Sequence, residues 1–282
     1  MLVCKDIKSL KKTISTLQEQ NLTIGFVPTM GALHEGHLAL VKQAKKESDV
    51  VVVSVFVNPT QFNNPEDLKN YPISLQEDIN LLERERCDIL FCPDVSEMYP
   101  NGNATKEYPL NGLDKGLEGK MRPGHFDGVC TVVHRLFDIV SPNKAFFGEK
   151  DFQQLAIIKH LVKTLDLDIE VHSCPTVRDA DGLAKSSRNK LLSPAHRKLA
   201  PLIYESLKKA KQSLAEKNST DLKEDVIKEI EACLEMTVEY VEIVNSETLK
   251  PLEKNNSLDN AHILAAVKLG NVRLIDNLAL ND

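Results

Sequence analysis

TIGFVPTMGALHEGH, residues 23–37, is the stretch that decides the fold. Its apolar run IGFV is typical of a buried strand, and Pro28, which has no N–H to donate, predicts that the chain turns there. Gly31 permits a backbone conformation that a Cβ would obstruct. Apolar residues then recur at helical spacing over about 36–48. The stretch therefore predicts a strand, a loop and the start of a helix.

Two histidines lie in the first turn of that helix. A helix start exposes backbone N–H groups and the positive end of the helix dipole, and both attract anions. His34 and His37 are three residues apart, so their imidazoles lie on one face and could donate to the same oxygens. This pattern predicts phosphate binding at the helix start.

Two other interpretations of the histidines compete with this one. A zinc site would favour HExxH, whereas HEGH is one residue shorter and has no third ligand close by. The pair could also be purely structural. HxGH after a strand resembles the signature of the nucleotidyltransferase superfamily, but the motif alone does not choose among the members of that superfamily.

Composition limits the class of protein. With 282 residues the chain could hold one large domain or two moderate ones, and two are more usual at this length. A formal charge of -6 argues against a dominant nucleic-acid surface. The amino terminus lacks the apolar core of a secretory signal, and no apolar stretch is long enough to span a bilayer. We expect a soluble, cytoplasmic protein that binds neither nucleic acid nor membrane.

The six cysteines form no CxxC pair and lie in no recognisable activating context. We expect reduced, structural thiols and no catalytic cysteine.

Residues 1–175 alternate between strands and helices. Helices are expected over 7–21, 75–86 and 129–140, and from about 151. DVVVVSVFVNP, DILFCP and KAFFG add strands to the first one, and 167–174 supplies another. Nearly unbroken β-branched runs are typical of central parallel strands covered on both faces. The alternation predicts an α/β fold, a Rossmann-like doubly wound parallel sheet.

A second domain is expected over 176–282, where the pattern changes. Helices over about 194–217 and 222–234 are followed by VEYVEIVN, HILAAVKL and VRLIDNLAL, which predict a smaller α+β domain. This domain would carry the KSSRN segment, residues 185–189, and act as a lid. The polar stretch 252–260 predicts a mobile turn.

Polar side chains follow the second of these strands, at the edge of an open α/β sheet where ligands bind. Asn58, Gln61 and Asn63 lie in this loop. An amide both donates and accepts, so Gln61 suits a small polar acid, and Asn58 is a second candidate for substrate binding. The alternative is that they are ordinary loop amides.

Three basic segments could contact an anionic ligand. Lys120, Arg122 and His125 cluster around a Pro-Gly turn. Lys150 lies at a second strand-to-helix turn, where an ammonium group can reach a phosphate held by neighbouring amides. Residues 185–188, KSSR, put two cations around two hydroxyls, a composition that suits pyrophosphate and a mobile loop.

Each basic segment also has a structural interpretation. The first could be a solvated loop, Lys150 could be a surface lysine paired with Glu149 or Asp151, and KSSR could be a helix-capping linker. The repeated strand-turn-helix layout favours a functional Lys150. Gln154, one helical turn later, could then face the same pocket.

Six motifs, taken in order and spacing, closely resemble the pantothenate synthetase family: FVPTMGALHEGH, VFVNPTQF, YP, RPGHFDGV, FFGEKDFQQL and DGLAKSSRN. The likeness covers about 22–192 and continues more faintly to the end. It implies a ligase of pantothenate biosynthesis that condenses pantoate with β-alanine, using ATP, through a pantoyl-adenylate, and releases AMP and pyrophosphate. It also implies magnesium and a homodimer.

The resemblance further implies which residues bind the substrates. Gln61 and Gln154 would bind pantoate, with Gln61 also near β-alanine. His37 would be the proton donor, with His34 beside it and Lys150 as a third catalytic candidate. ATP would be bound by Met30, Gly31, Ala32, Leu33, His34, Glu35, Gly36, His37, Gly148, Glu149, Lys150, Asp151, Val177, Lys185, Ser186, Ser187 and Arg188. It assigns no direct magnesium ligands.

Two positions depart from the family pattern. Position 185, often methionine, is Lys185, and the residue after Tyr-Pro, often basic, is Ile73. We expect the first to alter phosphate contacts and the second to weaken a peripheral contact.

Two other classes of function compete with a ligase. A nucleotide-binding regulator that performs no reaction is disfavoured by the intact His34, His37, Lys150 and 186–188. The other is an RNA-charging or nucleotide-transferring enzyme of the same superfamily. RNA charging is disfavoured by the acidic balance and by the lack of an anticodon-type basic domain.

Overall fold

The computed structural model describes residues 1–253 and 257–281. The chain divides into two compact units. Unit 1 comprises Met1–Asp114, Glu118–Glu149 and Gln154–Pro175, and unit 2 comprises Lys115–Leu117, Lys150–Gln153 and Thr176–Asp282. The middle of the turn expected over 252–260, residues 254–256, lies outside the described residues.

Unit 1 is built on a six-stranded sheet in which all strand pairings are parallel. Its strands are β1 (Leu2–Cys4), β2 (Ile24–Thr29), β3 (Val50–Val55), β4 (Ile89–Phe91), β5 (Lys144–Gly148) and β6 (Glu170–Cys174). Their spatial order is β1-β4-β3-β2-β5-β6. The order reverses at β2, because β3 and β4 lie on one side of it and β5 and β6 on the other. The predicted doubly wound α/β sheet is confirmed, and such sheets bind ligands at the carboxyl edge where the order reverses.

Helices connect these strands: α1 (Ile7–Glu19), α2 (Glu35–Glu47), α3 (Pro65–Lys69), α4 (Leu75–Arg84), α5 (Val95–Met98), α6 (Leu117–Met121), α7 (His125–Val140) and α8 (Phe152–Thr164). Two short 3-10 turns, η1 (Pro59–Gln61) and η2 (Glu149–Asp151), follow β3 and β5. Both turns continue the chain from the carboxyl end of a strand, where we expected polar ligand-binding residues.

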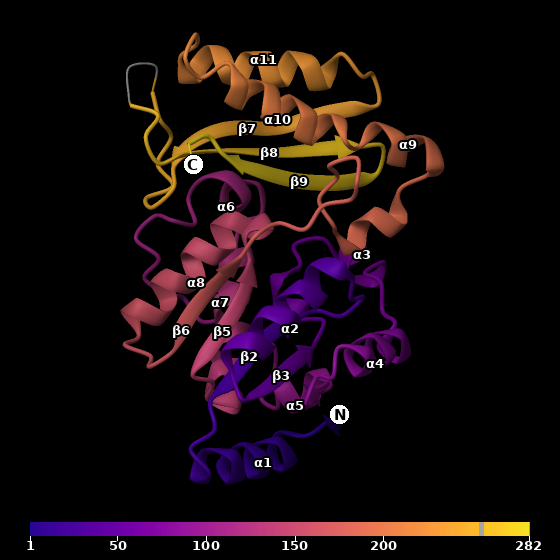
Figure 1. The fold of residues 1–282 in the computed structure, drawn as a ribbon, viewed down its shortest axis with the longest axis vertical. Helices are drawn as coiled ribbons and strands as arrows, with labels where there is room; N and C mark the ends of the chain where they lie inside the picture. The colour runs from indigo at the N-terminus through magenta and orange to yellow at the C-terminus, as the bar shows by residue number, and fades with distance from the viewer. Residues whose placement is uncertain (254–256, 282) are drawn as a thin grey trace. The chain divides into compact units, whose positions relative to one another are not determined.

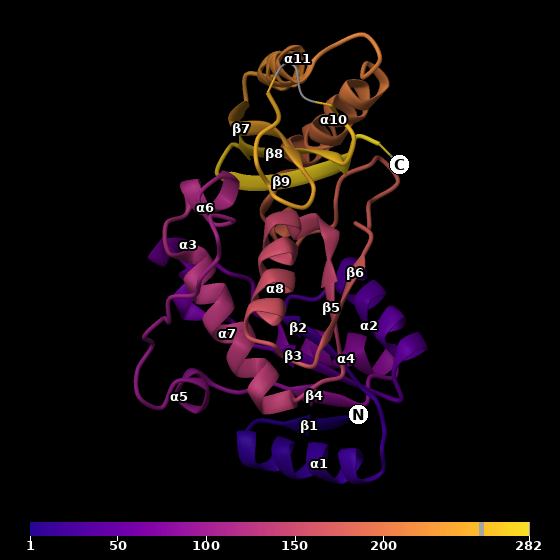
Figure 2. The same ribbon diagram turned by 90° about the vertical axis from the view of Figure 1, so that its left-hand side faces the viewer.

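Neighbouring strand residues point into two different cores. Phe26 and Phe147 pack in the core shared with α1, α7 and α8, whereas Val27 and Phe146 pack in the core shared with α2 and α4. Figure 2 shows α7 and α8 on one side of β5 and α2 on the other. Burial on both faces explains why the run VVVVSVFV is apolar at nearly every position.

The strand β2 does not end at Pro28 as predicted but continues to Thr29. Thr29 accepts from the N–H of Phe56, on the β3 side of the strand. Because successive residues of a strand face opposite neighbours, the nitrogen of Pro28 faces β5. Pairing with β5 covers only Gly25 and Phe26, so the missing N–H of the proline removes no ladder hydrogen bond.

Unit 2 contains a three-stranded antiparallel sheet, β7 (Met236–Asn245), β8 (Ala261–Leu269) and β9 (Val272–Ala279), in that order. Helices α10 (Leu202–Gln212) and α11 (Ser219–Glu231) cover one face of this sheet (Figure 1). The unit also contains η3 (Ser187–Leu191) and α9 (Pro194–Leu199). The predicted α+β character of this region is confirmed.

Further elements differ from the sequence prediction, including the short helices α3, α5 and α6, which were not predicted. The helix expected over 194–217 is interrupted between α9 and α10, where Pro201 cannot donate an N–H to a continuous helix. The pattern did not predict β1, which has only three residues, two of them exposed. Among the described residues, none of the helices has the length and apolar character that a membrane span requires.

Candidate active site

The loop after β2 is held by a buried carboxylate. Asp78 of α4 is 1% exposed and accepts from the N–H groups of Ala32, at 3.0 Å, and Leu33, at 2.7 Å. Gly31 has a φ of +83°, and a Cβ there would lie 2.9 Å from Val55 Cγ1, so this turn requires glycine. The loop therefore enters α2 along a fixed path, with two of its amides bound to Asp78.

Sequence reasoning did not identify Asp78, although a signal for it exists. Leu75, Ile79 and Leu82 mark the core-facing side of α4, and Asp78 occupies a position on that same side. A carboxylate on the apolar face of a helix needs buried donors. The backbone N–H groups of the loop after β2 supply these donors.

The two histidines cap α2. His34 is its N-cap residue: Nδ1 of His34 accepts from the N–H of Gly36 at 3.1 Å, and the N–H of His34 donates to Nδ1 of His37 at 3.3 Å. The ring centroids are 4.0 Å apart. Because each Nδ1 acts as an acceptor, the neutral form of each ring carries its hydrogen on Nε2. Both rings thus bring an Nε2–H donor to the start of α2.

The anion site predicted here therefore differs from the expectation in its donors. The amides of Ala32, Leu33 and Gly36 hydrogen-bond within the protein, so the Nε2–H groups are the donors that the histidine pair offers to a phosphate. The structural and functional interpretations are compatible, because the hydrogen bonds of the helix cap involve Nδ1 and not Nε2. Within residues 1–253 and 257–281, no group of three or more His, Cys, Asp and Glu side chains is arranged to hold a metal ion.

Asn58 and Gln61 are buried amides that hydrogen-bond to each other. They are 1% and 8% exposed. Asn58 Nδ2 donates to Gln61 Oε1 at 3.1 Å, and the hydroxyl of Tyr99 donates to Asn58 Oδ1 at 2.8 Å. Gln61 Nε2 donates to Sδ of Met30 at 3.0 Å, which brings the loops after β2 and β3 together. A thioether is a weak acceptor, so a carboxylate or hydroxyl of a ligand would be a stronger partner for this amide.

Arg122 and His125 hold the main chain of Gln61. His125 is 5% exposed, and its Nδ1 lies 2.8 Å from the carbonyl oxygen of Gln61. Arg122 Nη2 donates to the same oxygen at 3.3 Å, and Arg122 Nη1 lies 3.2 Å from Nε2 of His125. A carbonyl only accepts and a guanidinium only donates, so His125 is neutral with its hydrogen on Nδ1. The interpretation as a solvated basic loop is wrong for these two side chains, although Lys120 is exposed.

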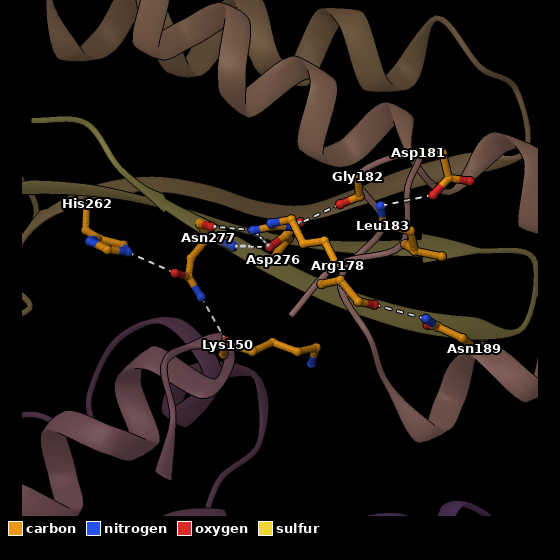
Figure 3. Close-up of polar contacts among 10 residues, drawn as sticks. Lys150, Arg178, Asp181, Gly182, Leu183, Asn189, His262, Asp276 and Asn277 are labelled. Atoms are coloured by element: carbon orange, nitrogen blue, oxygen red, sulfur yellow. Dashed lines mark hydrogen bonds and ion pairs between the residues drawn. The ribbon is translucent and has the colours of Figure 1, made fainter. Parts of the chain in front are cut away.

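In unit 2, Asn277 of β9 anchors the turn that carries Lys150 (Figure 3). Asn277 Nδ2 donates to the carbonyl oxygen of Lys150 at 2.8 Å, and the Lys150 side chain extends away from Asn277 in Figure 3. Among the residues that the structure describes, no ion pair joins Lys150 to Glu149 or Asp151. The pairing required by the surface-lysine interpretation is thus not observed.

The KSSRN segment is tied to its own unit. Lys185 Nζ pairs with Asp179 Oδ1 at 2.7 Å, so the charge that replaces the frequent methionine is balanced locally. Ser186 is the N-cap of η3, its hydroxyl oxygen accepting from the N–H of Arg188 at 3.3 Å. Ser187 is buried. The helix-capping interpretation therefore holds for Ser186.

The structure also places the remaining predicted residues. Gly148 ends β5, Gln154 is half-buried in the first turn of α8, and the carbonyl oxygen of Val177 accepts from the N–H of Lys185 at 2.9 Å. Ile73, the second departure from the family pattern, is 76% exposed. A basic side chain at this position would therefore act at the protein surface.

Three buried cysteines are unsuited to nucleophilic catalysis. Burial raises the pKa of Cys87 and of Cys174 to about 11, and that of Cys130 to about 12. The thiolate is the reactive form of cysteine. These three thiols stay protonated near neutral pH, in agreement with the structural role expected of them.

A doubly wound parallel sheet with polar residues at its carboxyl edge has the architecture of the α/β class of ligand-binding proteins. The chain matches the family described as Pantoate-beta-alanine ligase over residues 2–279. It belongs to that family and is a ligase.

Relatives with known names support this assignment. The pantothenate synthetase of Thermotoga petrophila is 48% identical, over 99% of this chain and 100% of its own. A pantothenate synthetase structure from Thermus thermophilus has a TM-score of 0.93 at 42% identity and covers both chains fully. A pantoate-beta-alanine ligase structure from Francisella tularensis, complexed with beta-gamma ATP and beta-alanine, has a TM-score of 0.84 at 40% identity, covering 99% of this chain and 98% of that one. The family predicted from the six motifs is confirmed.

Proposed function

We propose that this protein condenses pantoate with β-alanine, using ATP, through a pantoyl-adenylate, and releases AMP and pyrophosphate. The family match over residues 2–279 carries this proposal. The Francisella tularensis relative, whose structure holds beta-gamma ATP and beta-alanine, supports ATP and β-alanine as substrates.

The first step joins pantoate to AMP. The carboxylate of pantoate attacks the α-phosphorus of ATP, and pyrophosphate leaves. This brings anionic groups together, so preorganised N–H donors and cations lower the barrier where charge develops. His34 and His37 would supply Nε2–H donors, and Lys150 and Arg188 would supply positive charge. No protein nucleophile is needed.

The second step forms the amide bond. The neutral amine of β-alanine attacks the acyl carbon of the adenylate, and AMP leaves with the phosphate oxygen. Water must be kept from the adenylate, because hydrolysis would waste it. We propose that residues 185–188 close on the phosphates and help to exclude water, as expected of a segment that carries two cations and two hydroxyls.

Gln61 and Gln154 would orient pantoate. The amide of Gln61 donates to the weak acceptor Sδ of Met30, and a hydroxyl or carboxylate of pantoate would replace that partner. Asn58 fixes the other end of the same amide. Gln61 would therefore present its N–H donors to the acid in a single orientation.

Magnesium would arrive with ATP. Mg²⁺ is usually held by one or two carboxylates and by substrate phosphates rather than by a protein cage. Asp151, exposed beside Lys150 in η2, would share the ion with the phosphates, and the ion would neutralise phosphate charge.

We also propose that the protein is a homodimer and that it is located in the cytoplasm. Light scattering tests the oligomeric state.

The proposal is tested by incubating the protein with ATP, magnesium, pantoate and β-alanine. We expect AMP and pantothenate in equal amounts. ATP and pantoate without β-alanine should support exchange of labelled pyrophosphate into ATP, because the adenylate forms first. Strict dependence of the exchange on β-alanine would contradict this order. ATP binding without any turnover would instead favour the nucleotide-binding regulator.

Replacing His125 with alanine is expected to raise KM for pantoate about tenfold, the effect of removing roughly one hydrogen bond to Gln61. KM for ATP should change little. His125→Asn places an amide N–H near the position of Nδ1 and should restore much of the loss. Initial rates at varied pantoate test this, and equal values for the alanine and asparagine variants would show that the contact with Gln61 does not matter.

A further inference from the structure

Asn277 fixes the turn that carries Lys150 at two points. Asn277 is 6% exposed and donates from Nδ2 to the carbonyl oxygen of Lys150 at 2.8 Å. Its Oδ1 lies 2.8 Å from Nε2 of His262, which therefore donates. The His262 ring stacks on Phe152 with a centroid distance of 3.9 Å. Asn277 thus holds the main chain of Lys150 directly. It also orients the His262 ring, which packs on Phe152.

The preceding residue, Asp276, holds a second segment. Asp276 is 5% exposed and accepts from both terminal nitrogens of Arg178, at 2.6 and 2.8 Å. Arg178 also donates to the carbonyl oxygen of Gly182 at 3.1 Å, and its guanidinium lies 3.6 Å from the centroid of the Tyr204 ring. Figure 3 shows Arg178 and Asp276 beside Asn277. Such a bidentate, buried pair fixes the direction of both side chains.

The segment that Arg178 anchors is a short hairpin leading directly into KSSRN. Arg178 and Ala184 form an antiparallel bridge, and the N–H of Lys185 donates to Val177 at 2.9 Å. The hairpin turns at Gly182, which has a φ of +92° and where a Cβ would lie 2.7 Å from Tyr204. Arg178 therefore anchors the hairpin from which residues 185–188 extend.

Two adjacent residues of β9 thus hold the two segments of unit 2 proposed to contact phosphate. A buried carboxylate and a buried amide carry a desolvation cost that apolar residues of similar size would avoid. We infer that Asp276 and Asn277 are positioning residues for ATP: Asn277 acts through Lys150, and Asp276 acts through Arg178 and the segment 185–188. This inference rests on the proposed function.

The positioning role of Asn277 is tested by Asn277→Leu, which keeps the approximate side-chain volume but removes the hydrogen bonds to Lys150 and His262. We expect KM for ATP to rise about tenfold, with pantoate binding unchanged. Asn277→Asp keeps an acceptor for His262 but has no N–H for Lys150, so it should behave like leucine. In a Lys150→Met background Asn277→Leu should have no further effect on ATP use. An equal rise in KM for ATP in both backgrounds, or an unchanged KM, would overturn the role assigned to Asn277.

The positioning role of Asp276 is tested by Asp276→Asn, which keeps the shape of the side chain but removes the charge facing Arg178. We expect KM for ATP to rise, and this rise to persist in the Lys150→Met background, because it acts through a different segment. Loss of the effect in that background, or no rise in a folded variant, would overturn the assignment. If Asp276→Asn does not fold, Arg178→Lys provides the same test, since it keeps the charge but cannot bind Asp276 in bidentate fashion.

The matched control is Leu274→Ala, at a buried position of the same strand. It should lower Tm without changing KM for ATP. A similar rise in KM for this control would mean that ATP use follows stability alone. ATP binding by calorimetry needs no turnover, so the positioning role can be tested even if the wild-type protein makes no pantothenate. A wild-type protein that binds ATP but makes no pantothenate would refute only the proposed function.

Discussion

His37→Ala is expected to slow adenylate formation by about a hundredfold or more, because a single positioned donor to developing charge typically contributes that much. The Nδ1 of His37 accepts from His34 at the helix cap, so the variant should also lose about 1 kcal/mol of stability. The fold should remain intact. A single-turnover measurement with ATP and pantoate gives the rate, and thermal unfolding gives the stability.

Two further substitutions separate the cap from the donor. His37→Asn keeps an acceptor near the position of Nδ1 and should restore stability without restoring the rate. His37→Gln places an amide N–H near the position of Nε2 and should recover part of the rate. If the asparagine variant forms adenylate as fast as the wild type, Nε2 of His37 takes no part in the reaction.

The sheet could be predicted because its residues encode it locally. Strands buried on both faces give continuous apolar runs, as VVVVSVFV does, and each is followed by a helical repeat. The strand β1 could not be found in this way, because three residues provide no period. The prediction that β2 ends at Pro28 was wrong. A missing N–H matters only where a neighbouring strand would accept a hydrogen bond from that position. That neighbour is a property of the fold and not of the local sequence.

The candidate site also contains some features that the local sequence predicts and others that depend on the fold. His34, His37 and Gln61 were found because they follow strands, and the chain direction alone places them at the carboxyl edge. The contacts that hold the segments 150–151 and 178–188 were missed, because the two partners of each contact lie far apart in the chain. Asp276 lies 98 residues from Arg178, and Asn277 lies 127 residues from Lys150. A polar residue within an apolar strand or helix face, such as Asn277 in VRLIDNLA or Asp78 in α4, is the only local sign of such a contact.

Lys150→Met is expected to lower kcat/KM for ATP by about a hundredfold, near the upper end of the effect of one charge-assisted hydrogen bond. Methionine keeps most of the volume of the stem and deletes the charge. Stability should change little, because Asn277 binds the main-chain oxygen of Lys150 and not its side chain. Pantoate binding should also be nearly unchanged. Initial rates at varied ATP, pantoate calorimetry and thermal unfolding measure the three quantities.

The control for this substitution is Lys159→Met, the same change at an exposed position of α8, which should leave ATP use unaltered. Lys150→Arg keeps the charge but presents a planar fork in place of a compact ammonium group, so it should recover only part of the activity. Full recovery with arginine would mean that positive charge alone is required and that its geometry is not. If Lys150→Met forms adenylate at the normal rate with normal ATP affinity, Lys150 is a surface lysine, and the anchor that Asn277 provides serves the fold and not the phosphates.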